Sequence, residues 1–241
     1  MEKVGGLSRE IVVESCLEAV AEAAAMRVAR EARAAVEARG AFTLVLSGGS
    51  TPEGLYRVLA GSAYDDLPWA STHLLWGDER CVSPQDERSN YRLAETTGLL
   101  ERAVAGVHRM RGEDPPEDAA AAYERVLLTL ADGIGGGPEL DLILLGMGHD
   151  GHTASLFPGS PDVEERDRWV VATAEHSGMR RLTLTMPVFL AARRVMFLVT
   201  GSPKRELVQR ALHEEDPTMP AGLVVGGARA LTWIMDEAAA G

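Results

Sequence analysis

The sequence is poor in cysteine, in basic residues and in long apolar runs, and each shortage excludes a class of protein. Only two cysteines occur, Cys16 and Cys81, far apart in the chain, so neither a disulfide framework nor a zinc cluster is expected. The 24 basic residues against 36 acidic residues leave a formal charge of −12, which argues against a nucleic-acid surface or an anionic membrane as partner. An anionic ligand would therefore need a locally basic pocket.

Membrane spans and targeting signals are also missing. No apolar run approaches the length of a membrane span, and the amino-terminal residues lack the apolar core and cleavage site of a secretory signal. We therefore expect a reduced, cytoplasmic protein. A chain of 241 residues can bury a sizeable core, and we predict one α/β domain over 1–241. Its oligomeric state, monomer or small homo-oligomer, stays open.

Short apolar runs alternate with helical patterns along the chain. Strands are predicted over 42–46, 73–76, 142–145, 169–172, 182–186 and 195–200. Helices are predicted over 8–40, 89–100 and 115–130, and also from Thr51 and from Lys204 onward. The glycine-rich segment 133–138 is interpreted as a loop rather than a domain boundary. This alternation indicates a three-layer α/β domain with a mostly parallel sheet.

The segment SGGST, from Ser47 to Thr51, follows one predicted strand and opens a helical pattern, as a phosphate cradle does. Gly48 and Gly49 let the backbone approach an anion, the hydroxyl groups of residues such as Ser50 donate hydrogen bonds, and the next helix presents unpaired N–H groups. The segment lacks the lysine of a nucleotide-binding P-loop. The alternative is an ordinary strand-to-helix turn that Thr51 caps.

Charged residues follow other apolar runs. Asp78, Glu79 and Arg80 come after the second predicted strand. Carboxylates can orient a histidine or take a proton, and a guanidinium can hold a phosphate or a developing oxyanion. Solvated or mutually paired side chains are the simpler interpretation. Arg181 (or its neighbour Arg180) and Lys204 could add positive charge to an anion site.

Asp150 and His152 lie in a glycine-punctuated turn after the strand predicted over 142–145. Open α/β sheets place their chemistry at the carboxyl ends of their strands. A neutral imidazole with a reference pKa of about 6.5 can take a proton from water, and a neighbouring carboxylate can fix its orientation. The histidine could instead only hydrogen-bond within the turn. A metal pair formed with His149 would lack a third ligand nearby, so no metal is expected.

Four motifs together carry a family resemblance. They are LSGGSTP at 46–52, WGDERCV at 76–82, SNYRLA at 89–94 and LLGMGHDGHTASLFP at 144–158. In this order they resemble the 6-phosphogluconolactonase family, whose fold is similar to that of glucosamine-6-phosphate deaminases and ribose-5-phosphate isomerases. The resemblance implies a Rossmann-like α/β/α sandwich, which by itself supplies no nucleotide.

The resemblance also implies an activity and a set of site residues. The reaction would be hydrolysis of the small-molecule sugar lactone 6-phosphoglucono-δ-lactone to 6-phosphogluconate, in the oxidative pentose phosphate pathway and without cofactor or metal. His152 would be the base that activates water, with Asp150 beside it. The substrate and its phosphate would contact Ser47, Gly48, Gly49, Ser50, Thr51, Asp78, Arg80, Arg181 and Lys204.

Two other functions stay open. A glucosamine-6-phosphate deaminase is disfavoured because the deaminases resemble DGHIAFNEP in this region, with a carboxylate where this chain has Phe157. A non-catalytic sugar-phosphate sensor would need a DNA-binding segment, and no basic helix-turn-helix region lies ahead of Phe42. The group that stabilises the oxyanion is open between the backbone N–H groups of residues 146–151 and Arg80. The remaining histidines, interpreted as structural or surface residues, are His73, His108, His176 and His213.

Overall fold

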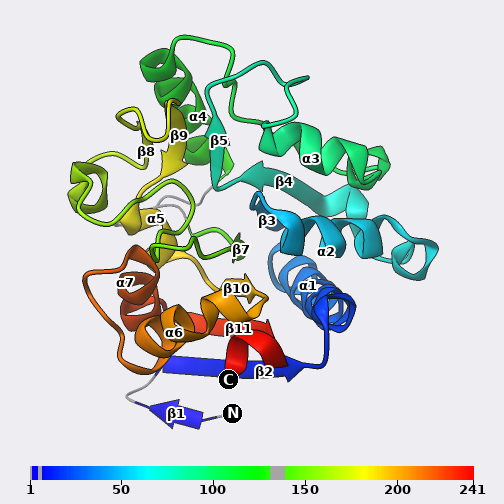
Figure 1. Cartoon of the computed structure of the whole chain (residues 1–241). Coiled ribbons are helices and arrows are strands. Elements are labelled where there is room, and N and C mark those ends of the chain that lie inside the picture. The colour runs from blue at the N-terminus through cyan, green and yellow to red at the C-terminus, as the bar shows by residue number, and fades with distance from the viewer. Residues whose placement is uncertain (1, 5–6, 131–138) are drawn as a thin grey trace.

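The computed structural model describes residues 2–4, 7–130 and 139–241, so the loop predicted over 133–138 lies outside the described residues. Within them, eight strands form a sheet in the order β1-β2-β11-β10-β7-β3-β4-β6 (Figure 1). All neighbouring pairs from β2 to β6 are parallel, and β1 is antiparallel to β2. The strands are β1 (Glu2–Val4), β2 (Leu7–Glu14), β3 (Phe42–Leu46), β4 (Thr72–Trp76), β6 (Gly106–Val107), β7 (Leu142–Leu145), β10 (Val195–Val199) and β11 (Ala230–Asp236). The prediction of a mostly parallel sheet is confirmed.

Helices cover both faces of this sheet. Figure 1 shows α1 and α2 on one face and α5 and α7 on the other, so the predicted three-layer sandwich is present. The helices are α1 (Leu17–Arg39), α2 (Ser50–Ala60), α3 (Asn90–Thr96), α4 (Pro116–Leu130), α5 (Met186–Ala191), α6 (Arg205–Val208), α7 (Pro220–Gly227) and α8 (Glu237–Ala240). Among them, none has both the length and the apolar character that crossing a membrane requires.

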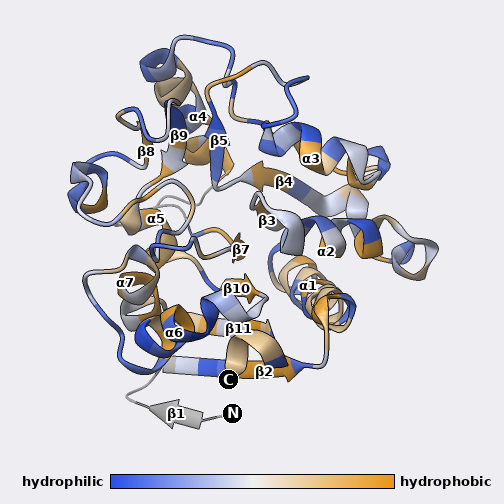
Figure 2. Ribbon diagram, viewed as in Figure 1, coloured by the Kyte–Doolittle hydropathy of each residue, from blue (hydrophilic) through white to orange (hydrophobic). Residues whose placement is uncertain are grey.

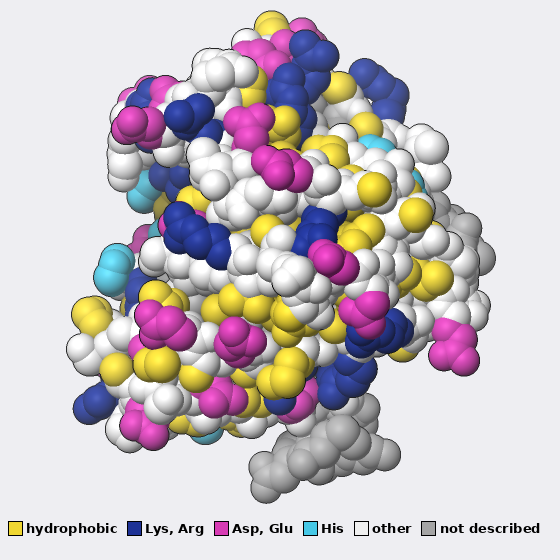
Figure 3. Space-filling view, turned by 90° about the vertical axis from the view of Figure 1, so that its right-hand side faces the viewer, with side chains coloured by type: hydrophobic (Ala, Val, Ile, Leu, Met, Phe, Trp, Pro, Cys, Tyr) yellow, Lys and Arg dark blue, Asp and Glu magenta, His cyan; other side chains and the backbone are white. Residues whose placement is uncertain are grey.

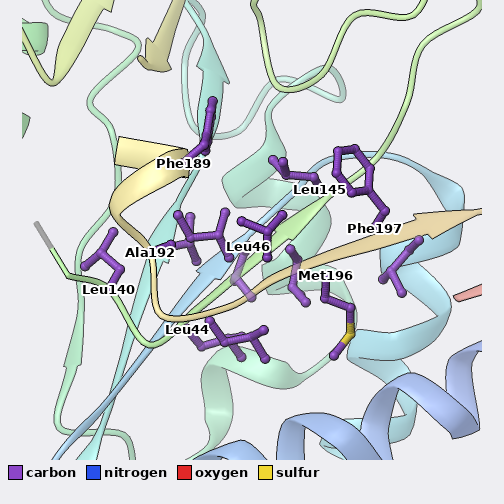
Figure 4. Packing of buried hydrophobic residues seen from close by; sticks show 14 of the residues in the cluster. Leu44, Leu46, Leu140, Leu145, Phe189, Ala192, Met196 and Phe197 are labelled. Carbon is purple, nitrogen blue, oxygen red and sulfur yellow. The ribbon is translucent and has the colours of Figure 1, made fainter. Parts of the chain in front are cut away.

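The core lies around the three central strands. Every residue of β3, β7 and β10 is buried, which explains why each strand is a continuous apolar run rather than an alternating one. In Figure 2 the hydrophobic colour is plain on β7 and β10, whereas helices such as α1 and α2 carry both hydrophobic and hydrophilic colour. Figure 4 shows Leu44, Leu145 and Met196, one from each strand, among the side chains that pack there together with Phe189 of α5.

The strand order reverses between β3 and β7. From β3 the chain continues outward to β4 and then β6, whereas from β7 it continues in the opposite direction to β10 and then β11. In an open α/β sheet, a crevice forms outside the carboxyl ends of the strands at such a reversal, and ligands bind there. A ligand-binding site is therefore expected at the loops that follow β3 and β7.

A second, smaller sheet lies beyond the carboxyl end of β4. It is antiparallel, in the order β5-β9-β8, and its strands are β5 (Asp78–Arg80), β9 (Arg181–Leu184) and β8 (Val170–Ala172). Gly77 joins β4 directly to β5, and its carbonyl accepts a hydrogen bond from Leu184 N–H at 2.8 Å. The residues 78–80, which were expected only to follow the end of a strand, thus form a strand of their own, and the predicted strands at β8 and β9 do not belong to the main sheet.

The first predicted helix is wrong at its amino-terminal end. Residues 7–14 form β2, and α1 begins only at Leu17. β2 pairs in parallel with β11, near the other end of the chain, from Ser8 with Ala230 to Glu14 with Asp236. A pairing over more than two hundred residues leaves no local trace in the sequence, and the spacing of Val13, Leu17 and later residues fits a helix equally well.

Candidate active site

A cavity of about 400 Å³ opens at the reversal point between β3 and β7. Its walls include the loops that follow β3, β7 and β10 and three residues of the small sheet, Asp78, Arg80 and Arg181. Ten of the predicted site residues line it: Ser47, Gly48, Gly49, Ser50, Thr51, Asp78, Arg80, His152, Arg181 and Lys204. The eleventh, Asp150, does not line the cavity but contacts His152, which does. The structure therefore brings all of them together.

The loop from Ser47 to Thr51 has the form of an anion cradle. Gly49 has φ = +111°, a conformation that favours glycine, and it directly precedes α2, whose N-terminus faces the cavity. Gly48 is needed for a different reason, because a Cβ there would lie 2.0 Å from the Asn90 side-chain oxygen. A hydrogen bond of 2.8 Å between the Thr51 and Thr200 hydroxyl groups joins this loop to the end of β10.

Three cationic side chains line the cavity in a protein whose net charge is −12. Arg80 and Arg181 are directly opposite each other on β5 and β9. Two like charges in this position destabilise the pairing of the strands. Burial and the nearby Arg80 hold the pKa of Arg181 below its usual value, and burial also lowers the pKa of Lys204. Elsewhere, as on the face in Figure 3, acidic and basic side chains are interspersed.

The buried Nε–H groups of Arg80 and Arg181 have no hydrogen-bond acceptor among the described residues. A buried donor without an acceptor is unfavourable, and an anionic ligand could accept hydrogen bonds from both guanidinium groups. Together with the cradle, they make the cavity suitable for a phosphorylated or carboxylated small molecule.

His152 and Asp150 form a hydrogen-bonded pair at the cavity wall. One carboxylate oxygen, Oδ1, lies 2.5 Å from the imidazole Nδ1 and also accepts the His152 backbone N–H at 3.0 Å. Burial lowers the pKa of His152 below 6.5 even though Asp150 and Asp78 oppose this shift, so the ring is neutral at pH 7. Partial burial acts to raise the pKa of Asp150, but the hydrogen bonds and the charge of His152 prevail and hold it below its usual value.

Two neighbours restrict the His152 ring. A Cβ on Gly148 would lie 2.0 Å from ring atoms Cε1 and Nδ1, so only glycine leaves room for the imidazole there. On another side, the Phe157 ring is centred 4.6 Å from the imidazole at an angle of 48°. Phe157, which marks the difference from the deaminase pattern, is thus a direct neighbour of the histidine.

Asp78 and Glu79 are held by a buried network around the start of α3. Glu79 accepts the backbone N–H groups of Asn90 at 2.7 Å and of Tyr91 at 2.8 Å, and burial raises its pKa despite these bonds. Asp78 accepts hydrogen bonds from the Ser155 hydroxyl at 2.6 Å and from the Asn90 side-chain amide at 3.1 Å. Glu79 therefore has a structural role, while Asp78 both lines the cavity and ties β5 to the loop of His152.

Sequence reasoning missed several contributors to the site. Asn90 and Ser155 lie inside motifs that were noticed, but nothing local indicated that both contact Asp78. Thr200 could have been found from its position at the carboxyl end of a parallel strand next to β7. His149 lines the cavity and is exposed. Within the described residues no cluster of three or more His, Cys, Asp or Glu could hold a metal ion, and metal-free chemistry stays a prediction.

The sequence model of the glucosamine-6-phosphate isomerase/6-phosphogluconolactonase family matches residues 16–233. The chain therefore belongs to this family of enzymes with a shared α/β fold. Within it, similar curated proteins include 6-phosphogluconolactonases: that of Synechocystis sp. is 40% identical over 211 residues, which cover 85% of this chain and 86% of the relative. The 6-phosphogluconolactonase of Mycobacterium tuberculosis is 39% identical over 228 residues, covering 90% and 92%.

Solved structures agree with this placement. The 6-phosphogluconolactonase of Trypanosoma brucei superposes with a TM-score of 0.85 at 26% identity, covering 97% of this chain and 98% of that one. A monomeric glucosamine-6-phosphate deaminase superposes with a TM-score of 0.80 at 22% identity, covering 96% and 98%, and at that identity it shows the fold alone. The Rossmann-like α/β/α architecture expected from the motifs is confirmed.

Proposed function

We propose that this protein is a 6-phosphogluconolactonase that hydrolyses 6-phosphoglucono-δ-lactone to 6-phosphogluconate in the cytoplasmic, oxidative part of the pentose phosphate pathway. One observation carries the proposal: a neutral, carboxylate-bound histidine faces the same cavity as an anion cradle and three cations. Such a cavity can hold a phosphate at one end and a carbonyl group at the other. The 6-phosphogluconolactonase relatives support the choice of substrate.

The proposed chemistry uses His152 as a general base. Asp150 accepts a hydrogen bond from Nδ1, so Nδ1 carries the proton and Nε2 is the atom that can accept another. Nε2 takes a proton from water as its oxygen bonds to the lactone carbonyl carbon. When the tetrahedral intermediate collapses, the bond between this carbon and the ring oxygen breaks, and the imidazolium returns the proton to that oxygen. A positioned base of this kind typically contributes about 100- to 10,000-fold in rate.

The oxyanion of the intermediate needs donors, and two of the backbone candidates are already engaged. Gly148 N–H donates to the His152 carbonyl at 2.8 Å, and Gly151 N–H donates to the Gly148 carbonyl at 3.3 Å. Arg80 also lines the cavity, but one of its guanidinium N–H groups donates to the Arg88 carbonyl, so its remaining N–H groups and the backbone N–H groups of residues 146, 147, 149 and 150 are the donors left for the oxyanion.

The phosphate group would act at a distance from the reacting carbon. Bound by the Ser47–Thr51 loop, Lys204 and Arg181, it would hold the carbonyl in line with the water that His152 activates. Binding energy from a non-reacting group of the substrate is thereby used to orient the reacting one. Unphosphorylated gluconolactone should for this reason be a poor substrate.

The test is a hydrolysis assay of purified protein with the phosphorylated and the unphosphorylated lactone, corrected for spontaneous hydrolysis. We expect a strong preference for the phosphorylated lactone, and a loss of about 100-fold or more in kcat for His152→Asn. Near-wild-type turnover by His152→Asn would refute the role of this residue. Equal rates with both lactones would refute the phosphate site.

The same preparation distinguishes the rival functions. Release of ammonia from glucosamine 6-phosphate would identify a deaminase, against which the buried Phe157 beside His152 argues, because an apolar ring stands where the deaminases have a carboxylate. Tight binding of the phosphorylated sugar without turnover would identify a sensor.

A further inference from the structure

Phe157 is the meeting point of three side chains. Its ring, 7% exposed, contacts the His152 imidazole at a centroid distance of 4.6 Å. The His176 ring stacks on it at 3.7 Å with an angle of 17° between the planes. The Arg181 guanidinium carbon lies 5.3 Å from its centroid. One buried phenyl ring therefore joins the histidine of the active site to two residues of another segment.

That segment is the hairpin between β8 and β9. His176 and Met179 exchange two backbone hydrogen bonds, of 2.9 and 3.2 Å, around the two-residue turn Ser177-Gly178. Both turn residues have positive φ, +53° and +76°, as in a tight hairpin turn of type I′. The turn fixes the backbone of His176 within a hydrogen-bonded hairpin, and from there its ring stacks on Phe157.

We propose that His176 is a positioning residue for His152, acting through Phe157, which it holds against the imidazole. The proposal rests on the proposed lactonase function, in which His152 is the base. His176 itself does not line the cavity, so it is not a catalytic residue. Its interpretation from the sequence as a structural or surface residue was incomplete, because its ring closes the outer side of Phe157.

The physical need for such a residue follows from the surroundings of His152. The imidazole is oriented by a hydrogen bond to Asp150, whose side chain is 46% exposed, so water competes for this bond. Phe157 supplies a second, apolar constraint and keeps water from one side of the ring. Without the stacked His176, the phenyl ring loses a partner at 3.7 Å and gains freedom to move away. A shift of about 1 Å in a reacting group can cost up to about 100-fold in rate.

Replacement of His176 removes none of the charged groups that act on the His152 imidazole. Asp150 comes from the same turn, Asp78 from β5 and Arg181 from β9, and these are the charged groups that act on the imidazole. Burial is the largest influence on the pKa of His152, and it lowers this pKa. Better access of water should therefore raise the pKa towards 6.5, which gives the proposal a signature separate from the rate.

The experiment compares four proteins: wild type, His176→Ala, His176→Phe and, as a control in the same hairpin, Glu175→Gln. For His176→Ala we expect kcat with the phosphorylated lactone to fall roughly 5- to 20-fold with little change in KM. His176→Phe keeps a stacking ring and should retain wild-type values, as should Glu175→Gln. The titration of the His152 ring protons, followed by NMR, should shift to higher pH only in His176→Ala.

Three results would overturn the proposal. Unchanged kcat and unchanged titration in His176→Ala would show that the stack does not reach His152. An equal loss in His176→Phe would show that the imidazole, not a stacked ring, matters. A rise in KM alone would place the effect on Arg181 instead. If the wild type lacks lactonase activity, the proposed function fails, and the NMR titration still decides whether His176 positions His152.

Discussion

The Tyr56 hydroxyl group forms two hydrogen bonds with the backbone of a single residue, Ser47. It accepts the Ser47 N–H at 2.8 Å and donates to the Ser47 carbonyl at 2.7 Å. Tyr56 is fully buried on α2, and burial raises its pKa, so the hydroxyl group keeps its proton at all ordinary pH values. The helix that begins at the anion cradle thus also holds the first residue of the cradle in place.

Removal of this hydroxyl group should loosen the cradle. Tyr56→Phe leaves a buried N–H and a buried carbonyl of Ser47 without partners, so we expect a loss of roughly 1–3 kcal/mol in the free energy of unfolding. The KM for the phosphorylated lactone should rise as well. Urea denaturation and steady-state kinetics measure the two effects.

Tyr123→Phe is the matched control. The Tyr123 hydroxyl group makes the same pair of bonds to Trp76, at 2.8 and 3.1 Å, at the end of β4. Its loss should lower stability by a similar amount and leave KM unchanged. If both variants change KM alike, the effect of Tyr56 does not pass through the cradle.

The pH dependence of the reaction should reveal the state of His152. Because burial lowers the pKa of this histidine, the acidic limb of kcat/KM should have its midpoint below pH 6.5, with full activity above it and loss as the ring gains a proton. Asp150 favours the protonated ring, so Asp150→Asn should move this limb to still lower pH and also reduce kcat by about tenfold or more. A limb that moves to higher pH in Asp150→Asn would contradict the assigned pair.

Gly148→Ala should damage catalysis with little general unfolding. The new Cβ would lie 2.0 Å from the His152 ring, so the imidazole must leave its position, and we expect kcat to fall roughly 100-fold. Gly54→Ala is the matched control on α2, where the new Cβ would have a contact of 3.5 Å to Ala21. This control should keep full activity and gain a little stability, since alanine favours a helix by about 0.5–1 kcal/mol over glycine. Wild-type kcat in Gly148→Ala would mean that the ring can act from elsewhere.

Lys204→Met tests the phosphate end of the cavity. A methionine keeps much of the apolar stem and loses the charge, so the KM for the phosphorylated lactone should rise roughly 10- to 100-fold, the range for one charged hydrogen bond. The rate with unphosphorylated gluconolactone should not change, because that substrate has no group for the cation to bind. Equal losses with both substrates would place Lys204 outside the phosphate site.

The elements whose residues are buried along their whole length could be predicted from the sequence alone. The strand over 42–46 was predicted with its observed bounds, since a fully buried parallel strand is a continuous apolar run. β2 was missed because its partner β11 lies more than two hundred residues away. β1 pairs only with the first three residues of β2, and beyond them the apolar side chains of Ile11 and Val13 are each 47% exposed, so they do not mark a buried face. Two strands of the small sheet, β8 and β9, were predicted as strands, but β5 was missed, because its partner β9 lies about one hundred residues away.

The candidate site also has parts that could be predicted from the sequence and parts that could not. The Ser47–Thr51 loop and the Asp150–His152 turn were found because each follows a buried strand directly. The contacts of Asp78 with Asn90 and Ser155, and the stacking of His176 on Phe157, join segments that no periodicity connects. These contacts could not be predicted from the sequence, because nothing about each side chain alone indicates which distant segment lies beside it.

Cations of the cavity and the proposed catalytic histidine come from two different sheets. Two of the three cations, Arg80 and Arg181, come from the antiparallel sheet β5-β9-β8, whereas His152 extends from a strand at the centre of the parallel one. Changes in the β8–β9 hairpin can therefore reach the cavity at Arg181 without altering the sequence of β7 or of the Asp150–His152 turn. Any redesign of this hairpin has to keep an aromatic ring at position 176, because that ring stacks on Phe157 beside His152.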